Sequence, residues 1–119
     1  MTRRGAIPLS AHGAIEVVAG PAIMIAPFAL GFGTVASAIC VAVGAILLGL
    51  SLQLEGPRRT IPLSAHASLE YALAVVAVAA GIGLAIAADA ASEAAFLVGI
   101  GVAQAMLTAT TRFSAARNA

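Results

Sequence analysis

The sequence predicts an all-α integral membrane protein, a bundle of four spanning helices, and three observations support this prediction. Hydrophobic residues make up 61% of the 119 residues and charged residues only 9%, whereas soluble domains carry about a quarter charged residues. The uncharged stretches are long enough to cross a bilayer, which takes about 20 residues. A six-residue phrase occurs twice and divides the chain into two halves. So much apolar surface cannot be covered by so few polar groups in water, and lipid is therefore the expected solvent.

The first expected helix covers about residues 10–30. It is an apolar run that carries one charge, Glu16, and follows an arginine pair. A basic start before an apolar run is also typical of a secretory signal peptide. The same segment recurs in the middle of the chain, where a signal peptide cannot act, so we interpret the run as a retained span. Pro21 and Pro27 lie inside it, and we expect them to bend the helix.

The second helix is expected at about residues 34–54. No charged side chain occurs from Val17 to Leu54, and this stretch is long enough for two spans. The Gly31–Thr34 segment provides the turn between them, with its threonine as the candidate N-cap of the second helix.

The second half of the chain repeats this plan. The third helix is expected at about residues 62–88, because Pro62 is well suited to a first helical turn. The fourth is expected at about residues 94–111, after an acidic loop that contains Asp89 and Glu93. The chain is then one transmembrane domain, residues 1–119, made of two tandem helical hairpins at residues 1–55 and 56–119.

All six arginines fall on one side of this topology. With four spans, both ends of the chain and residues 55–60 share a side, and the opposite loops carry only acidic charges. The positive-inside rule therefore predicts that both termini are cytoplasmic. The chain contains arginine but no lysine and is rich in alanine. This composition suits a bacterial protein, so the bacterial inner membrane is the expected location. The two hairpins enter from the same side as parallel repeats, unlike the inverted repeats of many transporters.

The repeated phrase is Ile-Pro-Leu-Ser-Ala-His, and each copy is followed by a glutamate four residues after the histidine. Residues four apart share a helix face, and two parallel helices with matching starts place both pairs at similar depth. Ionisable groups inside a membrane are costly to leave facing lipid, so we expect them to face the bundle interior. The candidate polar intramembrane cluster consists of His12, Glu16, His66, Glu70, Ser10 and Ser64.

Three interpretations of this cluster are open. The favoured one is a polar clamp, in which the glutamates accept hydrogen bonds from histidines, serines or arginines and fix the helix register. Two histidines and two carboxylates also suit zinc, iron or manganese, and a haem between His12 and His66 is a variant of this interpretation. The third is a proton or cation path through Glu16 and Glu70. The residues that would ligate any metal are His12, His66, Glu16 and Glu70, and no catalytic residue is expected.

Close helix packing in lipid is expected where small residues recur every four positions. Three spans carry such a row, and we expect these faces to point to the bundle interior. The rows are Ala36-Cys40-Gly44, Ala79-Gly83-Ala87 and Ala95-Gly99-Ala103.

Ala26-Pro27-Phe28, followed by Leu30-Gly31-Phe32, carries a family resemblance. The first half of the chain resembles the SPW-repeat family of small bacterial membrane proteins. In that family, paired helices are joined around Ser-Pro-Trp, which is followed by an apolar stretch and Gly-Phe. The resemblance implies a repeat-built integral membrane protein and supplies no functional residues.

The favoured function is therefore that of a non-enzymatic membrane protein, a structural or accessory subunit of a membrane complex. Its expected partners are the lipid bilayer and either other membrane subunits or further copies of itself. Nucleic acid is not expected, because the net charge is only +1. The alternatives are a small proton- or cation-linked transporter that uses Glu16 and Glu70, and a metal or haem binder that uses His12 and His66. No cofactor is required by the pattern, although haem or a divalent metal stays open.

Overall fold

The computed structural model describes residues 5–54 and 61–113, and these residues form four helices. They are α1 (Leu9–Leu30), α2 (Thr34–Leu52), α3 (Leu63–Ala87) and α4 (Ala91–Thr110). Each helix is long and apolar enough to cross a membrane. The predicted all-α membrane bundle is thereby confirmed, and α4 begins three residues earlier than expected.

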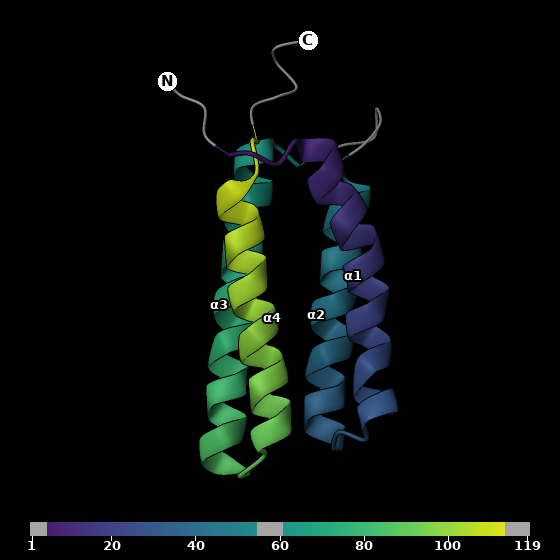
Figure 1. Ribbon diagram of the computed structural model, residues 1–119, viewed down its shortest axis with the longest axis vertical. Helices are drawn as coiled ribbons and strands as arrows, with labels where there is room; N and C mark the ends of the chain where they lie inside the picture. The colour runs from purple at the N-terminus through teal and green to yellow at the C-terminus, as the bar shows by residue number, and fades with distance from the viewer. Residues whose placement is uncertain (1–4, 55–60, 114–119) are drawn as a thin grey trace.

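The helices form two hairpins that stand side by side (Figure 1). α1 packs along α2 and α3 packs along α4, whereas contacts between the two hairpins are much sparser. The predicted tandem pairing is therefore confirmed. We call the end of the bundle that holds residues 5–8 and 111–113 the terminal end. The opposite end, with the two hairpin turns at residues 31–33 and 88–90, is the far end.

Within each hairpin the helix backbones approach one another closely at glycines. A Cβ atom on Gly20 would lie 2.9 Å from the carbonyl oxygen of Gly44, and one on Gly44 would lie 2.5 Å from that of Gly20. Gly81 and Gly101 approach in the same way, with a built Cβ 2.9 and 2.7 Å from a carbonyl oxygen of the facing helix. Contact energy in lipid comes from such close approach, so these four glycines hold the hairpins together.

Only one of the three predicted small-residue rows faces the interior. The row at residues 36–44 of α2 is buried, but the rows at residues 79–87 and 95–103 are exposed, so the prediction is wrong for α3 and α4. Alanine and glycine are common on every face of these helices, and their spacing alone does not mark the contact. The contact of α3 with α4 instead runs through Gly81 and Gly101.

The predicted threonine cap of α2 does not form, because Gly33 holds the N-cap position and Thr34 is the first residue of the helix. No described helix has a side-chain hydrogen bond at its N-cap. Pro8 and Pro62 hold the N-cap positions of α1 and α3, so Ser10 and Ser64 are already the second residues of their helices. Gly31 adopts a left-handed conformation (φ 73°) and ends α1, as the turn prediction required.

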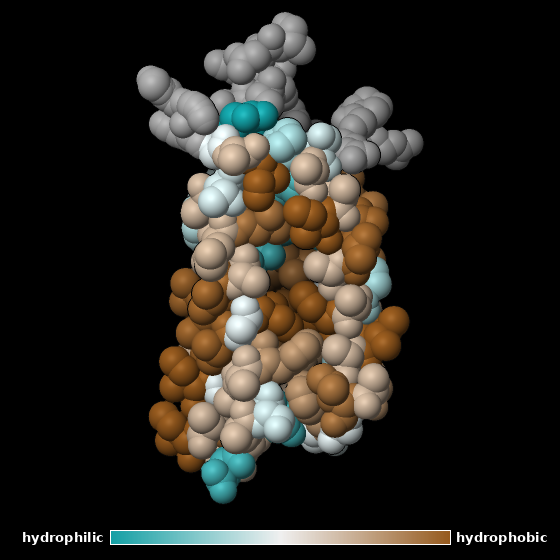
Figure 2. All heavy atoms as spheres, in the orientation of Figure 1, coloured by the Kyte–Doolittle hydropathy of each residue, from teal (hydrophilic) through white to brown (hydrophobic). Residues whose placement is uncertain are grey.

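The middle of the bundle is apolar. A buried cluster joins both hairpins and consists of Ile23, Cys40, Val43, Leu47, Leu73 and Leu97. Many large apolar side chains on the outside are exposed, among them Val18 at 71% and Ile86 at 80%. Figure 2 shows hydrophobic residues over most of the length of this face and hydrophilic residues mainly at its two ends. Such an outer surface is suited to lipid and not to water.

A short N-terminal segment links the two hairpins at the terminal end. Residues 5–8 run from the start of α1 across to the end of α4 (Figure 1). The amide of Ile7 donates to the carbonyl of Thr110 at 3.0 Å, and the amide of Arg112 donates to the carbonyl of Ile7 at 2.9 Å. These bonds form an isolated parallel bridge between Ile7 and Thr111, which no sequence pattern predicts.

Candidate functional site

The two histidine–glutamate pairs meet inside the bundle near the terminal end. α1 supplies His12 and Glu16, α3 supplies His66 and Glu70, and none of the four residues is more than 1% exposed. Because each pair lies in the first turns of its helix and the helices run parallel, the copies of the repeated phrase arrive at the same depth. We call these four residues the histidine–glutamate cluster.

Three short contacts hold the cluster together. Oε2 of Glu70 lies 2.9 Å from Nε2 of His12 and 2.6 Å from Nε2 of His66. Oε2 of Glu16 lies 3.2 Å from the same His12 nitrogen. One ligand atom from each of the four residues lies within 4.8 Å of the others. The cluster therefore joins the first hairpin to the second through side chains that all point to one place.

Helix α4 completes the cluster with residues that the sequence interpretation missed. Nε2 of Gln104 donates to Oε2 of Glu16 at 2.7 Å and also donates to Oε1 of Glu70. The hydroxyl of Thr108 donates to the same Glu70 oxygen at 3.2 Å. A signal was present in the sequence, because Gln104, Thr108 and Thr111 follow one face of an otherwise apolar span.

Thr111 fixes the protonation of one His12 nitrogen. Its hydroxyl donates to the carbonyl of Leu107 at 2.6 Å, so its oxygen is left to accept the hydrogen bond from Nδ1 of His12 at 2.8 Å. A neutral His12 then carries its proton on Nδ1 and presents the lone pair of Nε2 to the carboxylate oxygens. The lone pair of His12 Nε2 and those of the carboxylate oxygens repel one another unless a proton or a cation lies between them.

The cluster also needs positive charge. Two carboxylates are buried here, and a buried charge is strongly unfavourable unless it is compensated. Protonation of the histidines or of a carboxyl restores neutrality, and so does one divalent cation. Within the described residues, Oε1 of Glu16 is the one buried side-chain polar atom without a hydrogen-bond partner. This unpartnered oxygen belongs to a side chain that already points into the cluster.

The donor set fits a small metal ion and does not fit haem. Ligand atoms about 2.0–2.2 Å from a shared zinc ion lie roughly 3–4 Å from one another, which is within the spread seen here. A haem iron between His12 and His66 would need the space that Oε2 of Glu70 fills, because this oxygen contacts both Nε2 atoms. The geometry therefore favours a metal ion over a haem group.

The terminal end of the cluster is covered. The ring of Phe113 lies 5.3 Å from the ring of His12 and 6.0 Å from that of His66, measured between centroids. The bridge between Ile7 and Thr111 lies beside it. Together these groups shield the histidines from the solvent at this end.

Comparison with protein-family models, with curated proteins and with solved structures gives no match. The resemblance to the SPW-repeat family therefore stays a prediction.

Two of the six predicted site residues lie outside the cluster. Ser10 and Ser64 are exposed, so their inclusion in the site was wrong. Each serine is two positions before its histidine, and this spacing turns its side chain to the other side of the helix. The arginines expected as alternative partners of the glutamates belong to residues 55–60, which lie outside the described residues.

Proposed function

We propose that this chain is a non-enzymatic integral membrane protein that binds one divalent transition-metal ion in the histidine–glutamate cluster. The observation that carries the proposal is the convergence of four buried ligands from both hairpins on one point, with one carboxylate oxygen of Glu16 unpartnered. The ion supplies the two positive charges that the carboxylates require, and it accepts the lone pair of His12 Nε2.

The polar-clamp interpretation explains less of this geometry. In a clamp, each buried polar atom is expected to find a partner, because an unpartnered one costs about 1–3 kcal/mol. Oε1 of Glu16 breaks that expectation, whereas a metal ion can bind both oxygens of a carboxylate. The two interpretations share one consequence, since an ion held by α1 and α3 also ties the hairpins together.

The ligand set narrows the choice of metal. Imidazole and carboxylate ligands suit Zn²⁺, Fe²⁺ and Mn²⁺, whereas Cu⁺ prefers sulfur. The single cysteine, Cys40, is buried in the apolar core cluster and is not a ligand. Thr111 acts on the metal through His12, because a hydrogen bond to the second ring nitrogen orients a ligating histidine.

The remaining functional hypotheses concern the whole protein and not the histidine–glutamate cluster alone. Accessory membership of a larger membrane complex stays a prediction, as does the cytoplasmic orientation of the terminal end in a bacterial inner membrane, which the six arginines support. A transmembrane proton or cation path has no specific observation in its favour. The described interior between the cluster and the far end is lined mainly by apolar residues such as Leu47 and Leu97.

Metal analysis of the purified protein tests the proposal. The detergent-purified chain is stripped with a chelator, dialysed against Zn²⁺, Fe²⁺ or Mn²⁺, and analysed for metal per polypeptide. We expect one ion per chain, and loss of that ion in the variant His12→Ala with His66→Ala. The control variant is Ser10→Ala with Ser64→Ala, which changes the same two phrases at exposed positions. Metal content equal in both variants would exclude the cluster as the site.

A further inference from the structure

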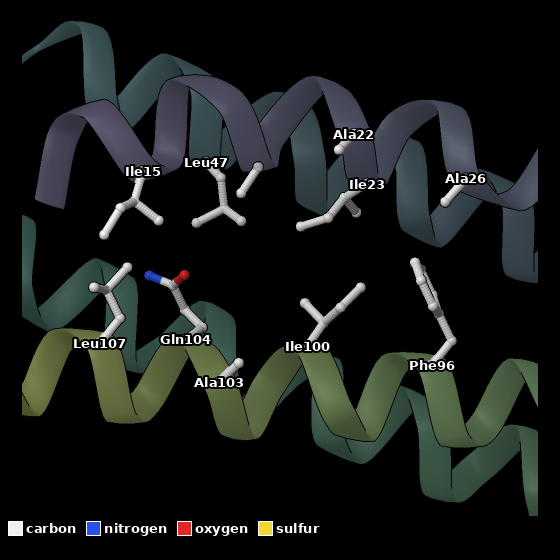
Figure 3. A pocket seen from close by; sticks show the side chains of 11 residues that line it. Ile15, Ala22, Ile23, Ala26, Leu47, Phe96, Ile100, Ala103, Gln104 and Leu107 are labelled. Carbon is white, nitrogen blue, oxygen red and sulfur yellow. The ribbon is translucent and has the colours of Figure 1, made fainter.

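A lateral groove runs between the two hairpins and opens between α1 and α4. Its volume is about 420 Å³, within the usual range of small-molecule pockets. Figure 3 shows side chains of α1 and α4, such as Ile23 and Ile100, pointing toward one another across it, with Leu47 of α2 beside them. The space-filling view of this face shows the surface hollowed between the hairpins (Figure 2).

Gln104 is the one polar residue among the groove's lining residues, and its side chain points into the space between the hairpins (Figure 3). The residue is only 7% exposed. Its Nε2 faces oxygens of Glu16 and Glu70. Since carboxylates only accept hydrogen bonds, these contacts fix which end of the amide is nitrogen. The carbonyl oxygen Oε1 is not fully buried and is left as an acceptor, and no described residue donates to it.

The position of the groove in the membrane defines the general form of its ligand. Both walls belong to membrane spans, so a ligand enters sideways from the hydrocarbon and must carry an apolar chain. Gln104 lies six residues before the end of α4, about 9 Å inside the terminal end. The groove continues from there to Phe96, a further distance of about 12 Å along the helix. A lipid in the leaflet of the terminal end has this orientation, with its polar group outermost.

The free acceptor at Gln104 defines the polar group of the ligand. A fatty-acid carboxylate only accepts hydrogen bonds, so it cannot pair with Oε1, and it would add a buried charge. An ester or a ketone offers only acceptor oxygens, and these cannot pair with Oε1. A neutral hydroxyl group donates one hydrogen bond and adds no charge. From these constraints we infer that the groove binds a neutral, hydroxyl-bearing lipid, whose hydroxyl donates to Gln104 and whose single chain lies between α1 and α4.

Two matched photoactivatable probes test this inference. One is a long-chain primary alcohol with a diazirine in its chain, and the other is its methyl ether, which keeps the chain and loses the donor. Each is added to the full chain in lipid nanodiscs, illuminated, and mapped by peptide mass spectrometry. We expect the alcohol to label α1 and α4 peptides that line the groove about 2- to 10-fold more than the ether, as for one net hydrogen bond.

Two variants separate the groove from the cluster. Gln104→Met should make alcohol and ether label equally, because the acceptor is lost. Ile100→Trp fills the groove without touching the cluster and should reduce labelling by both probes. Zinc content is measured in every preparation, so that loss of the ion is distinguished from loss of the lipid. Equal labelling of the wild type by alcohol and ether would overturn the inference, as would labelling that Ile100→Trp leaves unchanged.

Discussion

The substitution Glu16→Gln distinguishes a metal site from a polar clamp by the sign of its effect on the stability of the metal-free protein. In the metal-free protein, Glu16 is a buried carboxylate with one unpartnered oxygen. Glutamine keeps the shape and removes the charge, so we expect the metal-free variant to be as stable as the metal-free wild type or more stable. The gain comes from removing an uncompensated buried charge, whose effective penalty is several kcal/mol, because glutamine still leaves one buried polar atom without a partner at this position.

With zinc present, the same substitution is expected to be harmful. A ligand that binds only the folded state stabilises it by about 2.7 kcal/mol when its free concentration is 100 times its dissociation constant. Replacing one charged ligand by a neutral amide should weaken zinc binding about 100-fold, because losing even a hydrogen-bond partner of a ligand costs about 10- to 100-fold in metal affinity. At the same zinc concentration, the variant then loses nearly all of the stabilisation of about 2.7 kcal/mol that zinc gives the wild type. The stability order of wild type and variant should therefore reverse between chelator and zinc.

Reversible unfolding in mixed detergent micelles, followed by helical circular dichroism, measures both states. Each protein is titrated with sodium dodecyl sulfate in the presence of chelator and again in the presence of zinc. Ser64→Ala serves as the control and should show the zinc increment of the wild type, because Ser64 is exposed. A Glu16→Gln protein that is less stable than the wild type in chelator, with an unchanged zinc increment, would refute the reasoning and support a clamp.

Two further substitutions have expected outcomes. Gly44→Ala places a Cβ 2.5 Å from a backbone oxygen of α1. In the same unfolding assay, it should destabilise the protein by about 1–3 kcal/mol. Gly49→Ala is the control and should change stability little, because its Cβ meets no atom within 4 Å. Thr111→Val removes the acceptor for Nδ1 of His12 and should weaken zinc binding about 10- to 100-fold, measured by competition with a chelating dye. The exposed neighbour provides its control, since Thr110→Val should leave zinc affinity unchanged.

The sequence predicted the fold because charge is the strongest signal in a membrane protein. Long uncharged runs located the four spans, and Gly31 located the first turn. The sequence also predicted the four residues of the histidine–glutamate cluster, because the repeated phrase places His12 and His66 at the same depth. These features depend on residue type and position along one helix, which a single sequence contains.

The features that were missed depend on how the helices are rotated about their axes. In lipid, the outside of a helix is as apolar as the inside, so hydrophobic periodicity does not reveal the contact face. For this reason the rows at residues 79–87 and 95–103 were assigned to the wrong side. Gln104 and Thr108 lie four residues apart on one buried face of α4, but two polar residues in an apolar span are a weak signal for a contact face. The crossing of residues 5–8 is a tertiary contact without a local signal.

The hydrogen bond between His12 and Thr111 joins residues 99 positions apart, and this separation has a consequence for biosynthesis. When the first hairpin leaves the ribosome, His12 and Glu16 are in place, but their partners on α3 and α4 have not been made. The first hairpin therefore enters the membrane with a histidine–glutamate pair that lacks its partners on the second hairpin, and ionisable groups are costly in lipid. Only the last helix, α4, supplies Gln104, Thr108 and Thr111. We therefore expect a chain truncated after α2 to integrate poorly and to be degraded faster than the full-length protein.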